Sequence, residues 1–556
     1  FTNDLPEPTS EVVLILRANL YREPNPYLSK INLDSTYPSG FNPGWTKVRG
    51  ITDSDGNKLN YDSESLPPTS QTYSLKNTIL RVKLNKPVEP GEEGSIVVDF
   101  STKIPRKKEG DMEYFQGVYT WRFGWYPVLA PSEWWRGYDR KVYSQRKLIT
   151  ADYEVQLTVP EKFVVGGNKV DETEVKSAAK KGDKKRKLLE FELKEARSFP
   201  LVASANYEKY RGEFREFTVE VLHRPGYEER ARVLASYANE ILTFYSKRFG
   251  KYERDKLTFA QGAVSGYFGM AADGIIVLGD SFFGESQLAL SNITNRLSEY
   301  LIAHEIAHQW FGIGVGADLH TQNWISEAFS EYLSLNYFHH KYPEYKPNLF
   351  RFEENGLIRS FIESQLGYIN LRSHMFELPY IVNFQKGFDE AIVKPRQDVK
   401  YANATQTRVY KKGYMVLRTL EGIIGEDSMN EFIRGIYENY DEDIVDVDLL
   451  AEKVKAISGK EIPEDFFHDW LRTPGYIDYG VSGLTREKLD SGNYSNEIRV
   501  TKSGSLPAPV ELQVLLENDE KITHTVVLKE DKKTIKLETP ERVKRVTVDP
   551  NNYVMD

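Results

Sequence analysis

The residues best suited to chemistry lie in one short segment, His304-Glu305-Ile306-Ala307-His308. On a helix, two histidines four positions apart lie on the same face, one turn above the other. Their imidazoles can then converge on one point, as a tetrahedral zinc ion requires. Glu305 lies one position round the helix, where it can reach a metal-bound water without being a ligand. The segment therefore predicts a site for one Zn²⁺ ion, with Glu305 as the general base.

A third ligand is expected from the segment 324–332, where Glu327 opens the next helical pattern. Catalytic zinc sites commonly combine two histidines with a carboxylate, and a helix-turn-helix connection can return that carboxylate to the metal. Glu331, one turn later, is either a supporting group that orients a ligand or an ordinary polar residue.

The alternative for His304 and His308 is a pair of core histidines. Histidine is rare here, 9 of 556 residues, and the pattern arises by chance in roughly one such chain per hundred.

The elements that must position these residues follow from the hydrophobic periodicity. The first 200 or so residues contain short apolar or alternating runs typical of strands, at 12–16, 79–84, 95–100 and 153–159. A basic run at 176–187 is interpreted as a solvated hairpin tip rather than a binding patch. Helical spacing then recurs at 227–249, 290–311, 324–340, 407–424, 428–439 and 447–457, with Gly250 as a helix stop signal. Strand patterns return at 510–516, 523–528 and 543–548.

The composition limits the possible classes of function. A chain of 556 residues is expected to form two to four domains. Its net charge of -9 gives no electrostatic footprint for nucleic acid or anionic lipid, and no stretch approaches the roughly 20 apolar residues of a membrane span. The absence of Cys excludes disulfides, thiolate zinc sites and a cysteine nucleophile. The start at Phe1 fits either a removed signal peptide or anchor, or a sequence that was cut there, so the compartment is left open. Together with the absence of Cys it slightly favours an exported enzyme (secreted, periplasmic or cell-surface) over a cytoplasmic one.

These motifs resemble those of the aminopeptidase N type of gluzincin zinc peptidases, which includes leukotriene-hydrolase-like enzymes. The family signature is H-E-x-x-H, eighteen residues, and then a Glu within a W-x-x-E-x-F-x-x-Y-like segment, which the stretch from His304 to Glu327 matches. The resemblance covers most of the chain, through 199–204, 249–252, 308–312, 410–413, Trp470, Gly475 and 548–550.

The resemblance implies a multidomain α+β fold. It implies an N-terminal β-sheet saddle domain at 1–208, a mostly helical, thermolysin-like catalytic domain at 209–479, and a small C-terminal β-sandwich at 480–556. It resembles the three-domain members, without a C-terminal helical domain. The substrate implied is a peptide or protein.

The resemblance also implies roles for residues outside the zinc motif. Tyr410, in a Tyr-x-Lys-Gly context, would stabilise the oxyanion of the tetrahedral intermediate. Gly269, Met270 and Ala271 correspond to the family's Gly-x-Met-Glu-Asn strand, whose backbone can pair with an extended substrate.

Four residues depart from the family pattern. Phe268 stands where the family strand has its first Gly, and Gly269 stands at the variable position. Ala271 stands where the family has the Glu that binds the substrate's free amine, and Ala272 stands at the Asn position. Leu129 replaces the Asp of an N-terminal Phe-Pro-x-x-Asp-x-Pro stretch. Asp273 is one candidate to replace the missing carboxylate.

Three hypotheses follow. The first is a zinc peptidase that acts in the aminopeptidase manner. The second is an endopeptidase, or a peptidase for N-blocked or modified substrates. The third is a non-catalytic scaffold, which the complete set of His304, Glu305, His308, Glu327 and Tyr410 argues against.

Overall fold

The computed structural model describes most of the chain. The described residues are all of 1–556 except 25–29, 67–74, 109, 136–148, 176–184, 263, 265–267, 285–290, 344–372, 396–397, 402–403, 442, 459–461, 463–465, 507, 529, 552 and 555–556. Most of the predicted hairpin tip at 176–187 therefore lies outside the described residues. The described chain divides into two compact units, one of residues 1–246 and 251–316 and the other of residues 247–250 and 317–556.

The first unit begins with β-sheets, as the alternating sequence pattern predicts. Its core includes Val12, Val13 and Ile79, all without exposed surface. The strand orders of its first four sheets are β3-β4-β1-β8, β10-β13-β7-β6, β11-β12-β9 and β2-β5. The strands are β1 (Thr9–Ile15), β2 (Trp45–Asp53), β3 (Asn60–Leu66), β4 (Leu75–Val88), β5 (Ile96–Lys103), β6 (Met112–Phe115), β7 (Val118–Trp121), β8 (Val128–Leu129), β9 (Ala151–Pro160), β10 (Val164–Gly166), β11 (Lys169–Val175), β12 (Arg186–Ala196) and β13 (Leu201–Ser204). The short helical segments are η1 (Arg17–Tyr21), α1 (Lys30–Thr36) and η2 (Ser132–Trp134).

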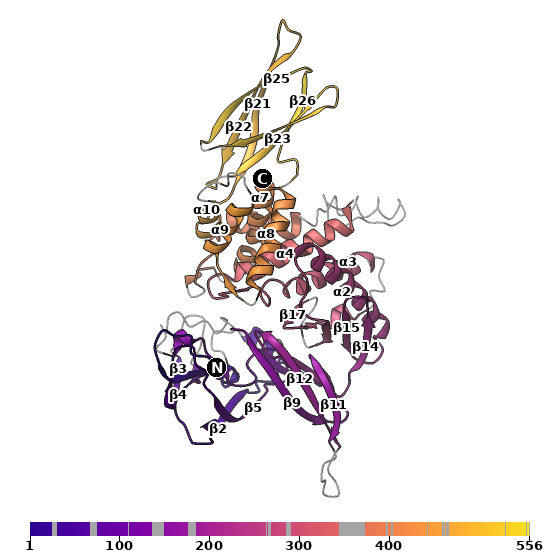
Figure 1. Ribbon diagram of the computed structural model, residues 1–556. Coiled ribbons are helices and arrows are strands. Elements are labelled where there is room, and N and C mark those ends of the chain that lie inside the picture. The colour runs from indigo at the N-terminus through magenta and orange to yellow at the C-terminus, as the bar shows by residue number, and fades with distance from the viewer. Residues whose placement is uncertain are drawn as a thin grey trace. The chain divides into compact units, whose positions relative to one another are not determined.

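A five-stranded sheet follows in the same unit, with the order β14-β15-β16-β18-β17. Its strands are β14 (Glu208–Glu213), β15 (Thr218–His223), β16 (Lys256–Gln261), β17 (Gly269–Ala272) and β18 (Ile275–Leu278). The three central strands run parallel, while β14 and β17 run antiparallel at the two edges. Figure 1 shows α2 (Glu228–Phe249) and α3 (Ser291–Ala307) beside this sheet, with η3 (Asp280–Phe282) between β18 and α3 in the chain. The predicted stop after α2 is confirmed, because Gly250 has φ +113°.

The second unit begins with helices that cover the predicted ranges. They are α4 (Asn323–Lys341), η5 (Ser373–Glu377), α6 (Leu378–Gln385), η8 (Thr407–Lys412), α7 (Gly413–Ile424), α8 (Glu426–Tyr440), α9 (Val447–Ser458) and α10 (Phe466–Arg472). The predicted helix 407–424 begins with the π-helix η8, which the sequence pattern did not indicate. Two-residue strands lie at β19 (Gly316–Ala317) and β20 (Ile444–Val445).

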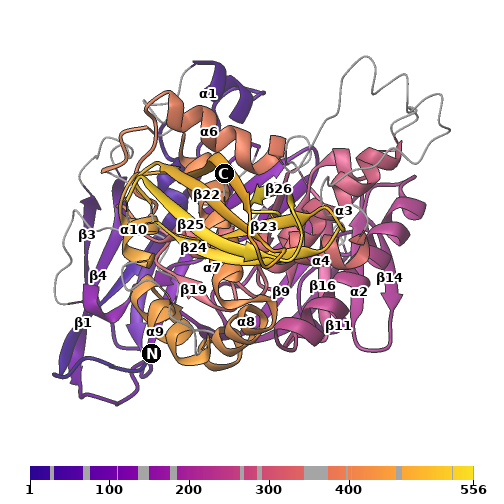
Figure 2. The ribbon, with the colours of Figure 1, turned by 90° about the horizontal axis from the view of Figure 1, so that it is seen from above.

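The second unit ends in two antiparallel three-stranded sheets, β21-β22-β25 and β24-β23-β26. Figure 2 shows these strands at the C-terminal, yellow end of the chain. The strands are β21 (Asp478–Lys488), β22 (Tyr494–Ser503), β23 (Pro509–Leu516), β24 (Lys521–Val527), β25 (Lys532–Thr539) and β26 (Val543–Val548). The mixed α+β class is therefore confirmed. The saddle, thermolysin-like and sandwich domains, with boundaries at 208/209 and 479/480, stay a prediction.

Candidate metal centre

The apolar face of α3 fixes the position of the zinc motif. Ile302, Ala303 and Ile306 have no exposed surface, so this face of the helix is in the core. Tyr245 of α2 donates a hydrogen bond to the Ala303 carbonyl at 3.1 Å. His304 is 8% exposed, which leaves a buried imidazole at the edge of that core. Packing on one face of α3 thus fixes the side chains on the other.

The helix ends earlier than predicted, and the difference affects His308. The spacing predicts a helix over 290–311, but α3 ends at Ala307. The chain then tightens, because the Gln309 and Trp310 amides donate to the Ile306 and Ala307 carbonyls, each at 2.9 Å. His308 lies at the start of this turn, and its ring centroid is still only 4.9 Å from that of His304.

A backbone carbonyl sets the tautomer of His308. Its Nδ1 lies 3.2 Å from the Phe311 carbonyl oxygen, which can only accept a hydrogen bond. Nδ1 therefore carries the proton, and the lone pair lies on Nε2, the atom left for a metal. Histidines that bind metals commonly donate their second N–H in this way, which fixes the orientation of the ring.

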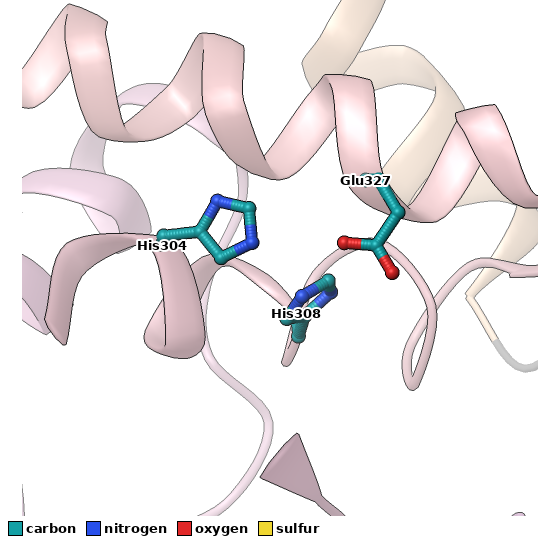
Figure 3. Close-up of side chains that lie close together, drawn as sticks. All are labelled: His304, His308 and Glu327. Atoms are coloured by element: carbon teal, nitrogen blue, oxygen red, sulfur yellow. The ribbon is translucent and has the colours of Figure 1, made fainter. Parts of the chain in front are cut away.

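The structure brings His304, His308 and Glu327 together. One ligand atom from each of these residues lies within 4.8 Å of the other two. In Figure 3 the two rings and the carboxylate point toward a common space, with Glu327 supplied by α4. Ligand atoms of a tetrahedral zinc ion lie about 3.3 Å apart, so small side-chain adjustments suffice. Two imidazole nitrogens and one carboxylate are also the donor set that a catalytic zinc site uses.

Glu305 lies against β17, where the absence of a side chain makes room for it. A Cβ atom on Gly269 would stand 2.4 Å from Glu305 Cγ and 2.5 Å from its Cδ. Met270 faces the other way, because it packs against a cluster that includes Val202 and Val277. Side chains alternate along a strand, so Ala271 shares the Glu305 face with Gly269. Two of the three predicted substrate residues thus have their Cα–Cβ directions toward the predicted base.

Residues 235–470 match the peptidase family M1 domain. Over this segment the chain is similar to peptidase family M1, and the curated relatives that it matches include aminopeptidases.

Several curated proteins are similar to parts of the chain. The chain is 24% identical over 279 residues to probable aminopeptidase 1 of Saccharolobus solfataricus, covering 49% of this chain and 32% of the relative. It is 24% identical over 348 residues to leucyl aminopeptidase of the same organism, covering 60% of this chain and 40% of the relative. It is 27% identical over 229 residues to aminopeptidase O of Rattus norvegicus, covering 37% of this chain and 25% of the relative. The chain thus matches between a quarter and two fifths of the length of these relatives.

A solved structure shows the same fold. The crystal structure of Legionella pneumophila aminopeptidase A in complex with aspartic acid matches with a TM-score of 0.62 and 12% identity. The match covers 98% of this chain and 55% of that chain.

The π-helix η8 carries Tyr410 and packs against α4. The ammonium of Lys411 lies 2.7 Å from the Glu331 carboxylate, one turn beyond Glu327. A Cβ atom on Gly413 would stand 2.8 Å from that of Ala328, the neighbour of Glu327. The sequence did not indicate the Lys411–Glu331 pair, which makes Glu331 a link between α4 and the helix of Tyr410.

The sequence did not indicate the contacts made by Lys412 and Gln309, which lie close to predicted site residues in the chain. Buried Lys412 pairs with Asp389 at 3.1 Å, and its pKa is lowered because burial outweighs that carboxylate. Buried Gln309, directly after His308, donates to the Ala272 carbonyl at 3.0 Å and accepts from the Gly274 amide at 3.1 Å. Gln309 thereby ties the end of the zinc motif to the turn after β17.

The structure shows what Asp273, the candidate replacement for the missing carboxylate, and Leu129 contact. Asp273 is 2% exposed, and its carboxylate accepts from the Arg197 amide at 3.1 Å and the Ser198 hydroxyl at 2.7 Å. Such a carboxylate holds the fold together and is not positioned to meet a substrate amine. Leu129 of β8 pairs with Leu14 of β1. Neither residue therefore replaces the carboxylate that is missing at Ala271.

Proposed function

We propose that this chain hydrolyses peptide bonds with one zinc ion bound by His304, His308 and Glu327. The observation that supports this proposal most directly is the convergence of the three ligand atoms within 4.8 Å. A bound zinc ion supplies Lewis acidity, which activates water and polarises a carbonyl group. The family match supports the class of reaction.

Glu305 moves the proton in this proposal. It lies next to His304 in sequence, and it is half-buried against β17. Its carboxylate accepts a proton from the attacking water and passes that proton to the leaving amine nitrogen as the C–N bond breaks. Gly269 leaves the space in which the side chain of Glu305 lies.

Tyr410 stabilises the charge that develops on the carbonyl oxygen. Its phenol donates a hydrogen bond to the oxyanion, an interaction that is worth roughly 3 kcal/mol in comparable sites. The ion pair between Lys411 and Glu331 holds the π-helix of Tyr410 against α4. The phenol therefore depends on the same helix that carries Glu327.

The test combines metal analysis with kinetics. The purified chain is expected to contain one zinc per molecule, and to cleave at least one of a free peptide and its N-acetylated form. Glu305→Gln should keep the zinc and lower kcat by about 10²–10⁴-fold, whereas His304→Ala should lose both. Glu229→Gln is the matched control, because Glu229 is 84% exposed on α2.

Three outcomes would contradict the proposal. Full activity of Glu305→Gln would refute the assigned base. Zinc retained by His304→Ala would refute the assigned ligand set. A chain without zinc that cleaves neither peptide would leave only the non-catalytic scaffold.

A further inference from the structure

The backbone N–H and C=O groups of β17 point alternately toward β18 and toward the opposite edge of the strand. The Gly279 amide donates to the Phe268 carbonyl at 3.1 Å, so the backbone of residue 268 faces β18. In an antiparallel pair, alternate residues face the partner strand. The backbone groups of Gly269 and Ala271 therefore face the other edge, at which no described strand pairs with β17. An extended substrate can add at that edge, beside Glu305.

A guanidinium group stands at this edge. Arg122, directly after β7, donates from Nη1 to the Ala271 carbonyl at 3.2 Å. Its Nε donates to the Gly110 carbonyl at 3.2 Å, and its side chain is 15% exposed. These bonds hold the cation next to residue 271, whose Cα–Cβ direction is toward Glu305. The position where the resembled family places a carboxylate thus holds a methyl group with a positive charge beside it.

The charges around Arg122 leave an excess of positive charge. Asp111 lies 3.5 Å from Arg122, but it also pairs with Arg17 at 2.5 Å. Lys107 and Glu113 belong to the same cluster. Burial raises the pKa of Glu113 to about 7, against the opposite effect of Lys107 and Arg122, so Glu113 is only partly ionised at neutral pH. Among these described groups, three cations therefore face fewer than two full negative charges.

We propose that Arg122 selects substrates that carry a carbonyl group on the nitrogen of the residue before the scissile bond. This inference rests on the proposed peptidase function. A free N-terminal ammonium meets a like charge at this edge and finds no carboxylate at residue 271. An acylated nitrogen is neutral, and its carbonyl oxygen can accept a hydrogen bond from the guanidinium. The acyl group has two sources, an N-terminal block such as acetyl or an upstream residue of a longer peptide.

The experiment compares three forms of one peptide. They are the free-amine form, the N-acetylated form and a form extended by two residues at the N-terminus. Values of kcat and KM are measured for each, and mass spectrometry identifies the cleaved bond. We expect the wild-type chain to process an acylated form at least about 10-fold more efficiently than the free amine. Faster cleavage of the acetylated form indicates a peptidase for blocked N-termini, and faster cleavage of the extended form indicates an endopeptidase.

Two variants test the residues directly. Arg122→Gln should reduce the advantage of the acylated peptides about 10-fold, because KM rises for the acylated forms and falls for the free amine once the like charge is removed. Ala271→Glu should shift selectivity the same way, since its carboxylate either binds the ammonium or neutralises Arg122. It does not remove the contacts of Arg122 with Gly110 and Asp111, so it tests the proposal even if Arg122→Gln fails to fold. Ala272→Ser is the control, because the side chain of Ala272 lies on the opposite face of the strand.

The outcomes separate the two proposals. Equal or faster cleavage of the free-amine peptide by the wild-type chain would overturn the role of Arg122 and leave the peptidase function intact. Unchanged selectivity in Ala271→Glu would do the same. If no peptide is cleaved, the peptidase proposal fails. The preference for acylated peptides is then tested by calorimetry, which measures the binding of the three peptides to Glu305→Gln. If the acylated peptides bind no more tightly than the free-amine peptide, the proposed role of Arg122 is refuted.

Discussion

Gly413→Ala would test whether the contact between α7 and α4 sets the geometry of the site. Gly413 has helical dihedral angles, φ -57° and ψ -45°, so alanine fits its backbone without strain. The added Cβ atom would stand 2.8 Å from Ala328 Cβ. Both atoms are attached directly to the backbone, so no side-chain rotation relieves the overlap. The helices themselves must separate.

The magnitude follows from that distance. Non-bonded carbon atoms approach to about 3.5 Å, so the helices must separate by roughly 0.7 Å. Alanine favours a helix over glycine by about 1 kcal/mol, whereas overpacking costs about 1–3 kcal/mol, so the net loss of stability is at most about 2 kcal/mol. The catalytic effect is larger. A misplacement of 1 Å costs about 10²-fold in rate, so we expect kcat to fall about 10–100-fold as Tyr410 moves away from the α4 segment that holds Glu327.

The assay measures kcat, zinc content and thermal unfolding on the same preparations. Gly435→Ala is the matched control, because a Cβ atom there would meet its nearest neighbour, Ile457, at an ordinary 3.8 Å. That variant should keep full activity and gain stability. Adding Ala328→Gly to Gly413→Ala removes the opposing atom and should restore kcat. A Gly413→Ala chain with wild-type kcat, or a double variant without recovery, would refute this account.

Two further predictions concern buried charges. The pKa of Glu113 is raised by burial from 4.5 to about 7, so the folded chain binds this proton more tightly than the unfolded chain. The free energy of unfolding should therefore fall between about pH 4.5 and pH 7, and Glu113→Gln should remove that part of the pH dependence in chemical denaturation curves. A slope that persists unchanged in the variant would contradict the assignment. Lys411→Met should cost about 3–5 kcal/mol, because it leaves the Glu331 carboxylate without its cation. Adding Glu331→Leu should recover most of that loss, and a double variant as unstable as the single one would contradict the pairing.

The parts of the site that depend on local spacing could be predicted from the sequence. The i, i+4 placement of His304 and His308 follows from helix geometry, and the structure keeps their rings 4.9 Å apart. The predicted end of this helix was wrong, because the chain tightens after Ala307 into a turn that the spacing of apolar residues does not distinguish from an α-helix. The π-helix η8 was missed because nothing in its spacing differs from an α-helix.

Contacts between distant parts of the chain could not be predicted. Arg122 and Ala271 are separated by 149 residues, and their hydrogen bond depends on how β7 and β17 are placed by the fold of the first unit. The sequence showed that a carboxylate was missing at residue 271, but it could not show which group stood beside it. Asp273 was a reasonable candidate from its sequence position alone. Its bonds to Arg197 and Ser198 show that it is used within the fold.

In the proposed mechanism, catalysis and selectivity depend on different elements. The base and two of the proposed ligands lie at the end of α3, whereas selectivity depends on β17. Within this four-residue strand, only Gly269 and Ala271 face Glu305, and Gly269 must stay small because Glu305 occupies its side-chain space. Residue 271 is therefore the one position of β17 at which a larger side chain can meet the substrate without displacing the base. A substitution there can change which peptide end is accepted while zinc binding and proton transfer stay as they are.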